Sequence, residues 1–188
     1  MDTGQVLRRI VHISTPVFLI YYFLPDPLWT GGPPRVLGLL MFLAIVFVAE
    51  ALRLLYWPNF IGMREYEKTQ MSAGAWAALG MTFAFLFFPF GYSAPALMGM
   101  GWVDPVIGDL RRKRSPQYPS VPILLYFLIV LVSMAVIIGP TVKVVAASLV
   151  AAPLAIWAER LKSSYVDDDF LMIVVPLIAI AGVTAVLS

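Results

Sequence analysis

Apolar residues fill long, nearly uninterrupted stretches of this chain, and charged residues are concentrated in the short segments between them. A helix needs roughly 20 consecutive apolar residues to cross the hydrocarbon core of a bilayer. Stretches of about this length can be drawn at residues 6–24, 36–56, 72–90, 91–108, 121–139, 141–160 and 169–187. The pattern predicts an all-α polytopic membrane protein with about seven transmembrane helices.

The segment 91–108 is the least regular of the seven. It contains Pro95, Pro105, four glycines and the acidic residue Asp104. Irregular backbone at membrane depth must be shielded by protein or line a wet cavity, so the segment either crosses as a broken helix or enters and returns. We expect it to span, because a returning segment would place the later loops on the wrong side for their charge.

Basic residues separate the two faces that seven spans create. Cytoplasmic loops carry an excess of Lys and Arg. Only Arg35 and Lys143 fall on the face opposite the N-terminus. The other 11 of the 13 basic residues fall on the N-terminal face: Arg8, Arg9, Arg53, Arg64, Lys68, Arg111, Arg112, Lys113, Arg114, Arg160 and Lys162. We therefore expect an integral protein of the cell membrane, with its N-terminus in the cytoplasm and its C-terminus outside.

Composition supports the same class of protein. Hydrophobic residues make up 61% of the 188 residues, charged residues make up 13%, and the mean hydropathy is +0.87. A soluble domain of this length would need more polar surface, so we expect residues 1–188 to form a single helical membrane domain. The absence of cysteine excludes disulfides and thiolate chemistry. The basic loops lie beside lipid and suit phosphates and anionic headgroups, and nucleic acid is not an expected partner.

The chemistry is expected at the cytoplasmic ends of the spans, because ionisable residues inside the membrane boundary are costly and tend to be functional. Asp104 lies about one helical turn inside that boundary, in a glycine- and proline-rich stretch that ends at Gly108. Glycine lets a backbone approach a phosphate closely, and nearby Arg111 and Arg112 offer guanidinium groups. The basic run 111–114 is equally well explained as a topology signal.

A second acidic group follows Glu159, which ends one span, because Asp167, Asp168 and Asp169 begin the next. One of the three can cap a helix, whose N-terminus favours negative charge. Three adjacent carboxylates repel one another unless a cation lies between them. Hard oxygen ligands indicate magnesium or calcium rather than zinc.

The other polar residues at this depth can be explained either by a structural role or by a functional one. Arg9 and His12 are three residues apart and share a helical face, so His12 either bonds a backbone group or takes part in chemistry. Glu50 and Arg53 have the same spacing, which predicts an intrahelical ion pair.

The polar run at residues 64–68 is expected to be a solvated loop. Ser72 follows it and can cap the next helix. Small residues around Gly74 permit a close approach between helices.

Together these elements resemble those of the CTP-dependent lipid-alcohol kinases, the family of dolichol kinase, phytol kinase and the yeast-type diacylglycerol kinase. The similarity covers essentially the whole chain, and at 188 residues it is most similar to the archaeal polyprenol kinases. Val103 stands where the family pattern has glycine, and Asp169 stands where it has asparagine. The matching elements are basic-x-x-His at Arg9 and His12, Ala-Glu-x-x-Arg at residues 49–53, Ser-x-Gly at Ser72 and Gly74, the Gly-Asp-Pro type segment at residues 103–108 with its basic run, and the late acids Glu159 and Asp167–Asp169 with Pro176 downstream.

The resemblance implies transfer of the γ-phosphoryl group of CTP to the hydroxyl of a long isoprenoid alcohol, such as a polyprenol or dolichol, at the cytoplasmic face. It implies that Mg²⁺ or Ca²⁺ is held by Asp104, Glu159, Asp167, Asp168 and Asp169. It implies nucleotide or phosphate contacts from Arg9, Arg53, Ser72, Gly74, Gly108, Arg111 and Arg112. Asp104, His12 and Glu50 are the implied catalytic residues.

Three alternatives stay open at this point. A cytidylyltransferase would join CMP to a lipid phosphate, although the His-Gly-Gly-rich signature associated with such enzymes is not found here. A small ion-coupled transporter would need charge near the membrane midplane, where this sequence has essentially none. A purely structural subunit would leave Asp104 and the three aspartates unexplained. The sequence does not choose the lipid alcohol, and it leaves a homo-oligomer open.

Overall fold

The computed structural model describes residues 3–57, 63–161 and 166–187, and each regular element in those ranges is a helix. This confirms the expected all-α class. Lys162, which was assigned to the basic face, lies outside the described residues. The elements are α1 (Thr3–Ser14), the 3₁₀ helix η1 (Thr15–Phe23), α2 (Arg35–Tyr56), the 3₁₀ helix η2 (Glu65–Lys68), α3 (Ala73–Phe87), α4 (Phe90–Arg112), α5 (Ser120–Ile137), α6 (Val142–Arg160) and α7 (Asp168–Val186).

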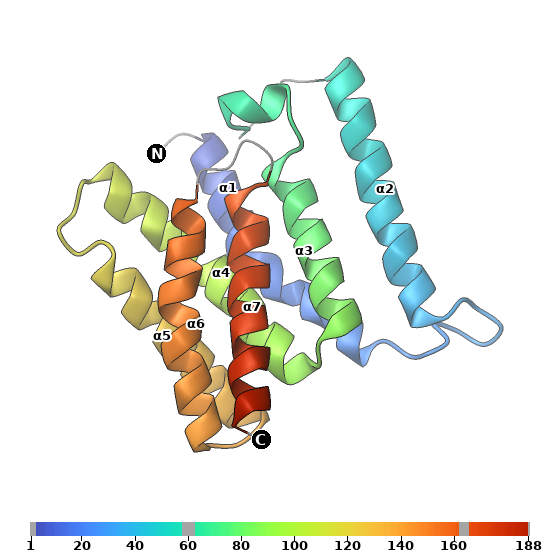
Figure 1. The fold of residues 1–188 in the computed structure, drawn as a ribbon. Coiled ribbons are helices and arrows are strands. Elements are labelled where there is room, and N and C mark those ends of the chain that lie inside the picture. Colours follow the sequence, from blue (N-terminus) through green and yellow to red (C-terminus); the bar gives the residue numbers. More distant parts are fainter. Residues whose placement is uncertain (1–2, 58–62, 162–165, 188) are drawn as a thin grey trace.

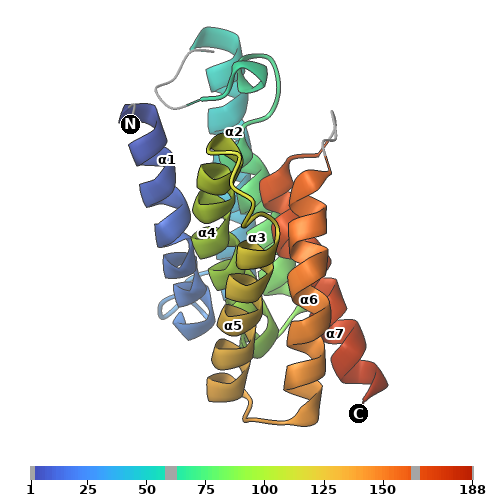
Figure 2. The same cartoon turned by 90° about the vertical axis from the view of Figure 1, so that its left-hand side faces the viewer.

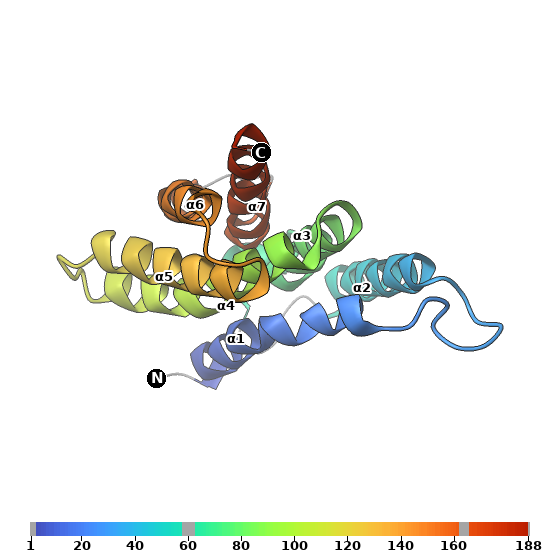
Figure 3. The ribbon, with the colours of Figure 1, turned by 90° about the horizontal axis from the view of Figure 1, so that it is seen from below.

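The helices form three layers when the molecule is seen along the bundle (Figure 3). The middle layer contains α5, α4 and α3, with α6 and α7 on one side and α1, η1 and α2 on the other. Small side chains let α6 lie close to α7, because Ala147, Ala151 and Ala155 follow one another at helical spacing and are fully buried. Met172, Ile173 and Leu177 of α7 fill the centre of the core.

Within the described ranges, four helices are long and apolar enough to cross a membrane, namely α2, α5, α6 and α7. The apolar α3 is shorter, at 15 residues. The structure therefore supports a helical membrane protein, and the number of seven spans stays a prediction.

The expected first span, residues 6–24, is not one α-helix. It divides at Ser14 into α1 and the nine-residue η1. Pro16 has no N–H group to continue the α-helical pattern, and the Thr15 hydroxyl donates to the Val11 carbonyl at 3.2 Å. A 3₁₀ helix rises about 2.0 Å per residue, so α1 and η1 together extend roughly 36 Å.

The segment 91–108 lies in α4, one helix of 23 residues that continues through Pro95 and Pro105. A helix of this length extends roughly 34 Å. The helix runs from one end of the bundle to the other (Figure 1). The segment therefore does not enter and return at the same end.

One end of the bundle collects the polar residues, and we call it the polar end. It contains the start of α1, the ends of α2, α4 and α6, the starts of α3 and α7, and η2 (upper end in Figure 1). The N-terminus lies there and the C-terminus lies at the opposite end (Figures 1 and 2).

Candidate functional site at the polar end

A pocket of about 830 Å³ opens at the polar end between α1, α4, the end of α6, the start of α7 and the η2 segment. Its size falls within the range typical of ligand sites. The residues that line it are Gln5, Arg8, Arg9, His12, Arg64, Tyr66, Gln70, Met71, Trp76, Asp104, Pro105, Gly108, Asp109, Arg111, Arg112, Glu159, Leu161, Val166, Asp167 and Asp168.

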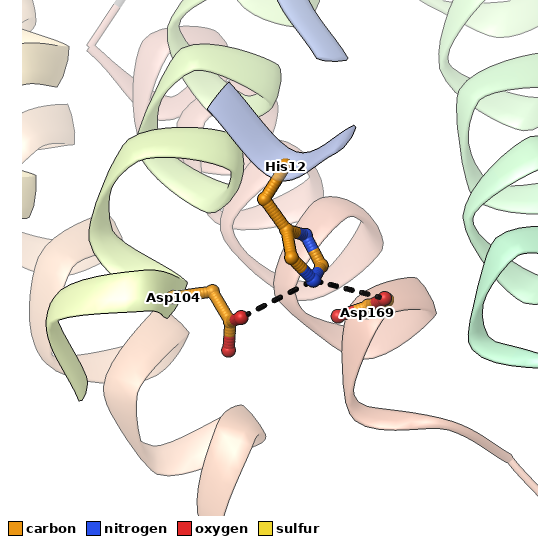
Figure 4. A group of neighbouring side chains, drawn as sticks. All are labelled: His12, Asp104 and Asp169. Atoms are coloured by element: carbon orange, nitrogen blue, oxygen red, sulfur yellow. Dashed lines mark ion pairs between the residues drawn. The ribbon is translucent and has the colours of Figure 1, made fainter. Parts of the chain in front are cut away.

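Three helices bring His12, Asp104 and Asp169 together (Figure 4), and His12 and Asp104 also line the pocket. The Nε2 atom of His12 lies 3.4 Å from Asp104 Oδ2 and 4.0 Å from Asp169 Oδ2. All three side chains are buried. The crossing of α1 and α4 fixes this geometry, because a Cβ atom on Gly101 would lie 2.5 Å from the His12 carbonyl oxygen. The basic-x-x-His element and the Asp-Pro element therefore meet in space.

The acidic residues of α4, α6 and α7 form two further groups. Asp104, Glu159 and Asp168 offer one group of oxygens, and Asp167, Asp168 and Asp169 offer another, with each group's atoms within 4.8 Å of one another. Asp167 also caps α7, since its Oδ1 accepts the Asp169 N–H at 3.0 Å. The sequence prediction that one of the three aspartates is a cap is confirmed.

Electrostatics favour a cation among these oxygens. Burial, and then the charge of Asp168, raises the pKa of Asp167 to about 6. The Oδ1 atom of Asp169 is buried without a hydrogen-bond partner among the described residues. A buried carboxylate oxygen without a donor is costly. A divalent cation with a preference for hard oxygen ligands fits this donor set.

Arginines form the rim of the pocket, and each pairs with an acid or amide. Arg9 and Arg112 both pair with Asp109. Arg111 pairs with Glu159, whose other oxygen lies 3.4 Å from the Tyr118 hydroxyl. The remaining rim contacts are Arg8 with Glu67 at 3.5 Å, Arg64 with Asp168 at 3.0 Å and Arg112 with Gln5 at 2.6 Å.

The η2 segment is part of the pocket, which corrects the expectation of a solvated loop at residues 64–68. Arg64 donates to the Tyr66 hydroxyl at 2.6 Å, and Tyr66 donates to Asp167 Oδ2 at 2.8 Å. Glu67 is only 3% exposed and accepts the backbone N–H groups of Arg64 and Ala73. Glu67 is buried through polar contacts while Glu65 and Tyr66 stay exposed, and composition alone does not reveal this difference.

The ionisation of η2 reflects these contacts. Burial lowers the pKa of Arg64, but the charges of Asp168 and Tyr66 and the hydrogen bonds to both together outweigh this effect, so the pKa lies above its ordinary value. Burial and the bond to Asp167 raise the pKa of Tyr66. Arg64 and Tyr66 are among the pocket residues that the sequence analysis did not select, as are Arg8 and Asp109. The only sequence signal is a tyrosine within a run of charged residues.

Five of the expected site residues lie outside the pocket lining. Asp169 lies beside the lining residue His12, whereas Glu50, Arg53, Ser72 and Gly74 belong to contacts between α2 and α3. Glu50 binds Arg53 through both oxygens, at 2.7 and 3.0 Å. Its carboxylate also accepts the Ser72 N–H at 2.5 Å and the Ser72 hydroxyl at 3.0 Å. Arg53 donates to the Gln70 carbonyl at 2.9 Å. These bonds attach the end of α2 to the start of α3 and occupy Glu50 as a structural acceptor.

Ser72 and Gly74 belong to this attachment. Ser72 caps α3, since its hydroxyl accepts the Ala75 N–H at 3.3 Å, as the sequence predicted. Gly74 is exposed, and a Cβ there would meet only the Ser72 hydroxyl, at 3.9 Å. The expected ion pair of Glu50 with Arg53 is confirmed. None of Glu50, Arg53, Ser72 and Gly74 lines the pocket, although Arg53 bonds the lining residue Gln70.

The other expected residues lie where a ligand could reach them. Gly108 lines the pocket, and a Cβ there would meet no atom within 4 Å. Val103, in the place of the family glycine, is fully buried in the core and turned away from the pocket lining. Arg9, Arg111, Arg112 and Glu159 all line the pocket.

Searches with the whole chain found no matching family model, no matching curated protein and no matching solved structure. The resemblance to the lipid-alcohol kinases therefore stays an expectation from the sequence motifs.

Proposed function

We propose that this protein is a CTP-dependent lipid kinase that phosphorylates the hydroxyl of a long-chain isoprenoid alcohol. One observation carries the proposal. Buried acids from α4, α6 and α7 form the bottom of a pocket whose rim holds five arginines, at the polar end of an apolar bundle. A nucleotide triphosphate with its cation presents the complementary charges, and a membrane alcohol can reach the same depth.

The acids suit the cation of such a substrate. Asp104, Glu159, Asp167, Asp168 and Asp169 offer oxygen ligands, and the unpartnered Oδ1 of Asp169 supports a cation at this position. Bound Mg²⁺ would neutralise charge on the triphosphate during transfer. The donor set fits Mg²⁺ or Ca²⁺ better than zinc.

The arginines suit the phosphates. Arg9, Arg111 and Arg112 lie on the rim, and Gly108 leaves open space beside the helix. Guanidinium groups bind phosphate oxygens through paired hydrogen bonds. Arg64 joins this set, because it faces the same acids from the opposite side of the pocket.

In the proposed reaction the alcohol oxygen attacks the γ-phosphorus of CTP. A new bond forms between them, the bond from the γ-phosphorus to the β–γ bridging oxygen breaks, and CDP leaves. His12 Nε2 accepts the alcohol proton, and the adjacent Asp104 and Asp169 carboxylates stabilise the resulting imidazolium. Phosphoryl transfer depends mainly on positioning and charge neutralisation, which this arrangement supplies.

The test is transfer of label to lipid by purified protein with Mg²⁺, using γ-³²P-CTP and α-³²P-CTP in parallel. The acceptors are a polyprenol, phytol, diacylglycerol and phosphatidic acid. Label from the γ position alone, arriving on an alcohol, is the expected result. Label from the α position on phosphatidic acid would identify a cytidylyltransferase. Transfer from neither position would exclude both nucleotide reactions and leave ion-coupled transport as the next hypothesis.

The membrane arrangement is part of the proposal. Seven spans in the cell membrane, with the polar end in the cytoplasm, agree with the basic residues near that end. The chain has no cysteine, so single variants report position directly. A membrane-impermeant maleimide added to intact cells should label Lys143→Cys and not Lys113→Cys, and the reverse pattern would invert the topology.

A further inference from the structure

A second hollow lies on the side of the bundle, between α1 and α4. It has a volume of about 480 Å³ and is lined by Arg9, Ile13, Trp102, Pro105, Val106 and Asp109. We call it the lateral groove. The two helices run in opposite directions (Figure 2), so Arg9 lies beside Asp109 at the polar end and Ile13 lies beside Trp102 further from it.

The groove narrows away from the polar end. At its closed end the helices touch, since a Cβ on Gly101 would meet the His12 carbonyl oxygen at 2.5 Å. The Trp102 indole N–H donates to the Ile13 carbonyl at 3.2 Å, which ties α4 to α1 at this end of the groove. At Gly108, two turns further along α4, a Cβ would meet no atom within 4 Å. The helices therefore diverge toward the polar pocket.

The walls of the groove change from apolar to charged along its length. Ile13 is 56% exposed and Trp102 is 42% exposed, on the face that a bundle of this kind turns to lipid. The charged end is formed by the Arg9–Asp109 pair. A molecule with a long apolar chain and a small polar end matches this order.

The groove also joins the polar pocket. Arg9, Pro105 and Asp109 line both hollows. Pro105 separates the groove from its neighbour Asp104, whose carboxylate faces His12 inside the bundle (Figure 4). A chain lying against Ile13 and Val106 therefore has its polar end at the entrance to the catalytic pocket.

We propose that the lateral groove binds the hydrocarbon chain of the acceptor, a single-chain isoprenoid alcohol, and directs its hydroxyl over Pro105 toward His12. The inference rests on the proposed kinase function for the identity of the acceptor. It adds the route from the bilayer and the residues that recognise the chain.

Two variants narrow the groove without touching the acids, Ile13→Trp and Val106→Trp. Each should raise the KM for a long polyprenol about tenfold, a change of the size that altered pocket contacts produce. The KM for CTP, which is proposed to bind in the polar pocket, should stay within about twofold. Ile45→Trp is the matched control, because Ile45 of α2 is 65% exposed and outside both hollows. An equal rise in the KM for CTP and for polyprenol in both variants, or no rise in either, would overturn the proposal.

A labelling experiment tests the groove without turnover. A polyprenol carrying a diazirine is photoactivated in phosphatidylcholine nanodiscs, and the labelled residues are mapped by mass spectrometry. Label on α1 and α4 around Ile13 and Val106, removed by excess unlabelled polyprenol, is expected. Label spread equally over the exposed face of α2 would show an ordinary lipid-facing surface and reject the groove as a site.

The two hypotheses fail in different ways. Groove labelling without transfer from γ-³²P-CTP would reject the kinase and keep a lipid-alcohol site. Transfer to polyprenol with no label in the groove would keep the kinase and reject this route.

Discussion

The guanidinium group of Arg64 lies 3.0 Å from the carboxylate of Asp168, although 104 positions separate the two residues in the sequence. Asp168 belongs to two of the acidic groups that suit a cation. In the absence of metal, the positive charge of Arg64 therefore partly neutralises the proposed metal site. A cation that binds there must share Asp168 with Arg64 or displace it.

Replacement of Arg64 by alanine should therefore strengthen cation binding in the absence of nucleotide. We expect the dissociation constant for Mn²⁺, measured by electron paramagnetic resonance, to fall about tenfold, equivalent to about 1.4 kcal/mol. The KM for CTP should rise in the same variant, because a phosphate-binding guanidinium is lost.

Arg64→Lys is the matched control, since it keeps the charge and loses the paired geometry. It should bind Mn²⁺ as the parent protein does and show a smaller rise in KM. Unchanged Mn²⁺ affinity in Arg64→Ala would show that Asp168 is not a metal ligand.

Asp104 is the residue on which the proposed chemistry depends most, because it belongs to the His12 group and to the Glu159 group. Asp104→Asn keeps the shape of the side chain and removes its charge. Turnover should fall at least about 100-fold, the scale of losing a residue that stabilises transferred charge. Size-exclusion elution and thermal unfolding should stay close to those of the parent protein. Near-normal turnover would remove the central residue of the scheme.

Variants of Glu50 and Glu159 should distinguish a carboxylate that stabilises the fold from one that serves the reaction. Glu50→Ala leaves buried Arg53 without its anion, and loss of one partner of a buried pair costs about 3 kcal/mol. Its thermal midpoint should fall clearly, while the kcat of the folded fraction stays near that of the parent protein.

Glu159→Gln should show the opposite pattern. Its midpoint should change little, and the Mg²⁺ concentration for half-maximal activity should rise about 10- to 100-fold, the cost typical of weakened metal coordination. If Glu50→Ala abolished kcat in well-folded protein, the assignment of Glu50 as a structural acceptor would be wrong.

The sequence predicted most of the helices well because apolar length is a strong signal, although residues 6–24 form α1 and η1 rather than one helix. Helices of similar length end at the same depth, so residues such as Asp104, Glu159 and Asp168 could be expected near one another. Their actual convergence depends on α7 packing against both α4 and α6. Sequence spacing does not supply that adjacency.

The sequence analysis also chose site residues only because they lie at the polar end, and some of these do not line the pocket. Glu50 lies at the same end as Asp104, but α2 stands at the edge of the bundle and contacts chiefly α3 (Figure 1). The rotation of α2 turns Glu50 toward Ser72. Arg64 and Tyr66 were missed for the converse reason, because a polar run was interpreted as solvated when its partners were other polar groups.

Two glycines of α4 give the last prediction, because alanine should act on them in opposite ways. Alanine is a better helix former than glycine by about 1 kcal/mol. At Gly101 that gain is outweighed, since the new Cβ would lie 2.5 Å from the His12 carbonyl oxygen and must push α1 away. Gly101→Ala should lower kcat at least about tenfold through displacement of His12, since small misplacements of reacting groups are costly.

At Gly108 the new Cβ meets no protein atom within 4 Å, so Gly108→Ala should raise the thermal midpoint. It should still raise the KM for CTP, because the methyl group occupies space that faces the pocket. Gly182→Ala in α7, which also meets nothing within 4 Å, controls for helix propensity and should change the midpoint alone.

A KM for CTP that is the same in Gly108→Ala and Gly182→Ala would mean that the nucleotide does not approach α4 at Gly108. Full activity in Gly101→Ala would mean that the crossing of α1 and α4 does not position His12.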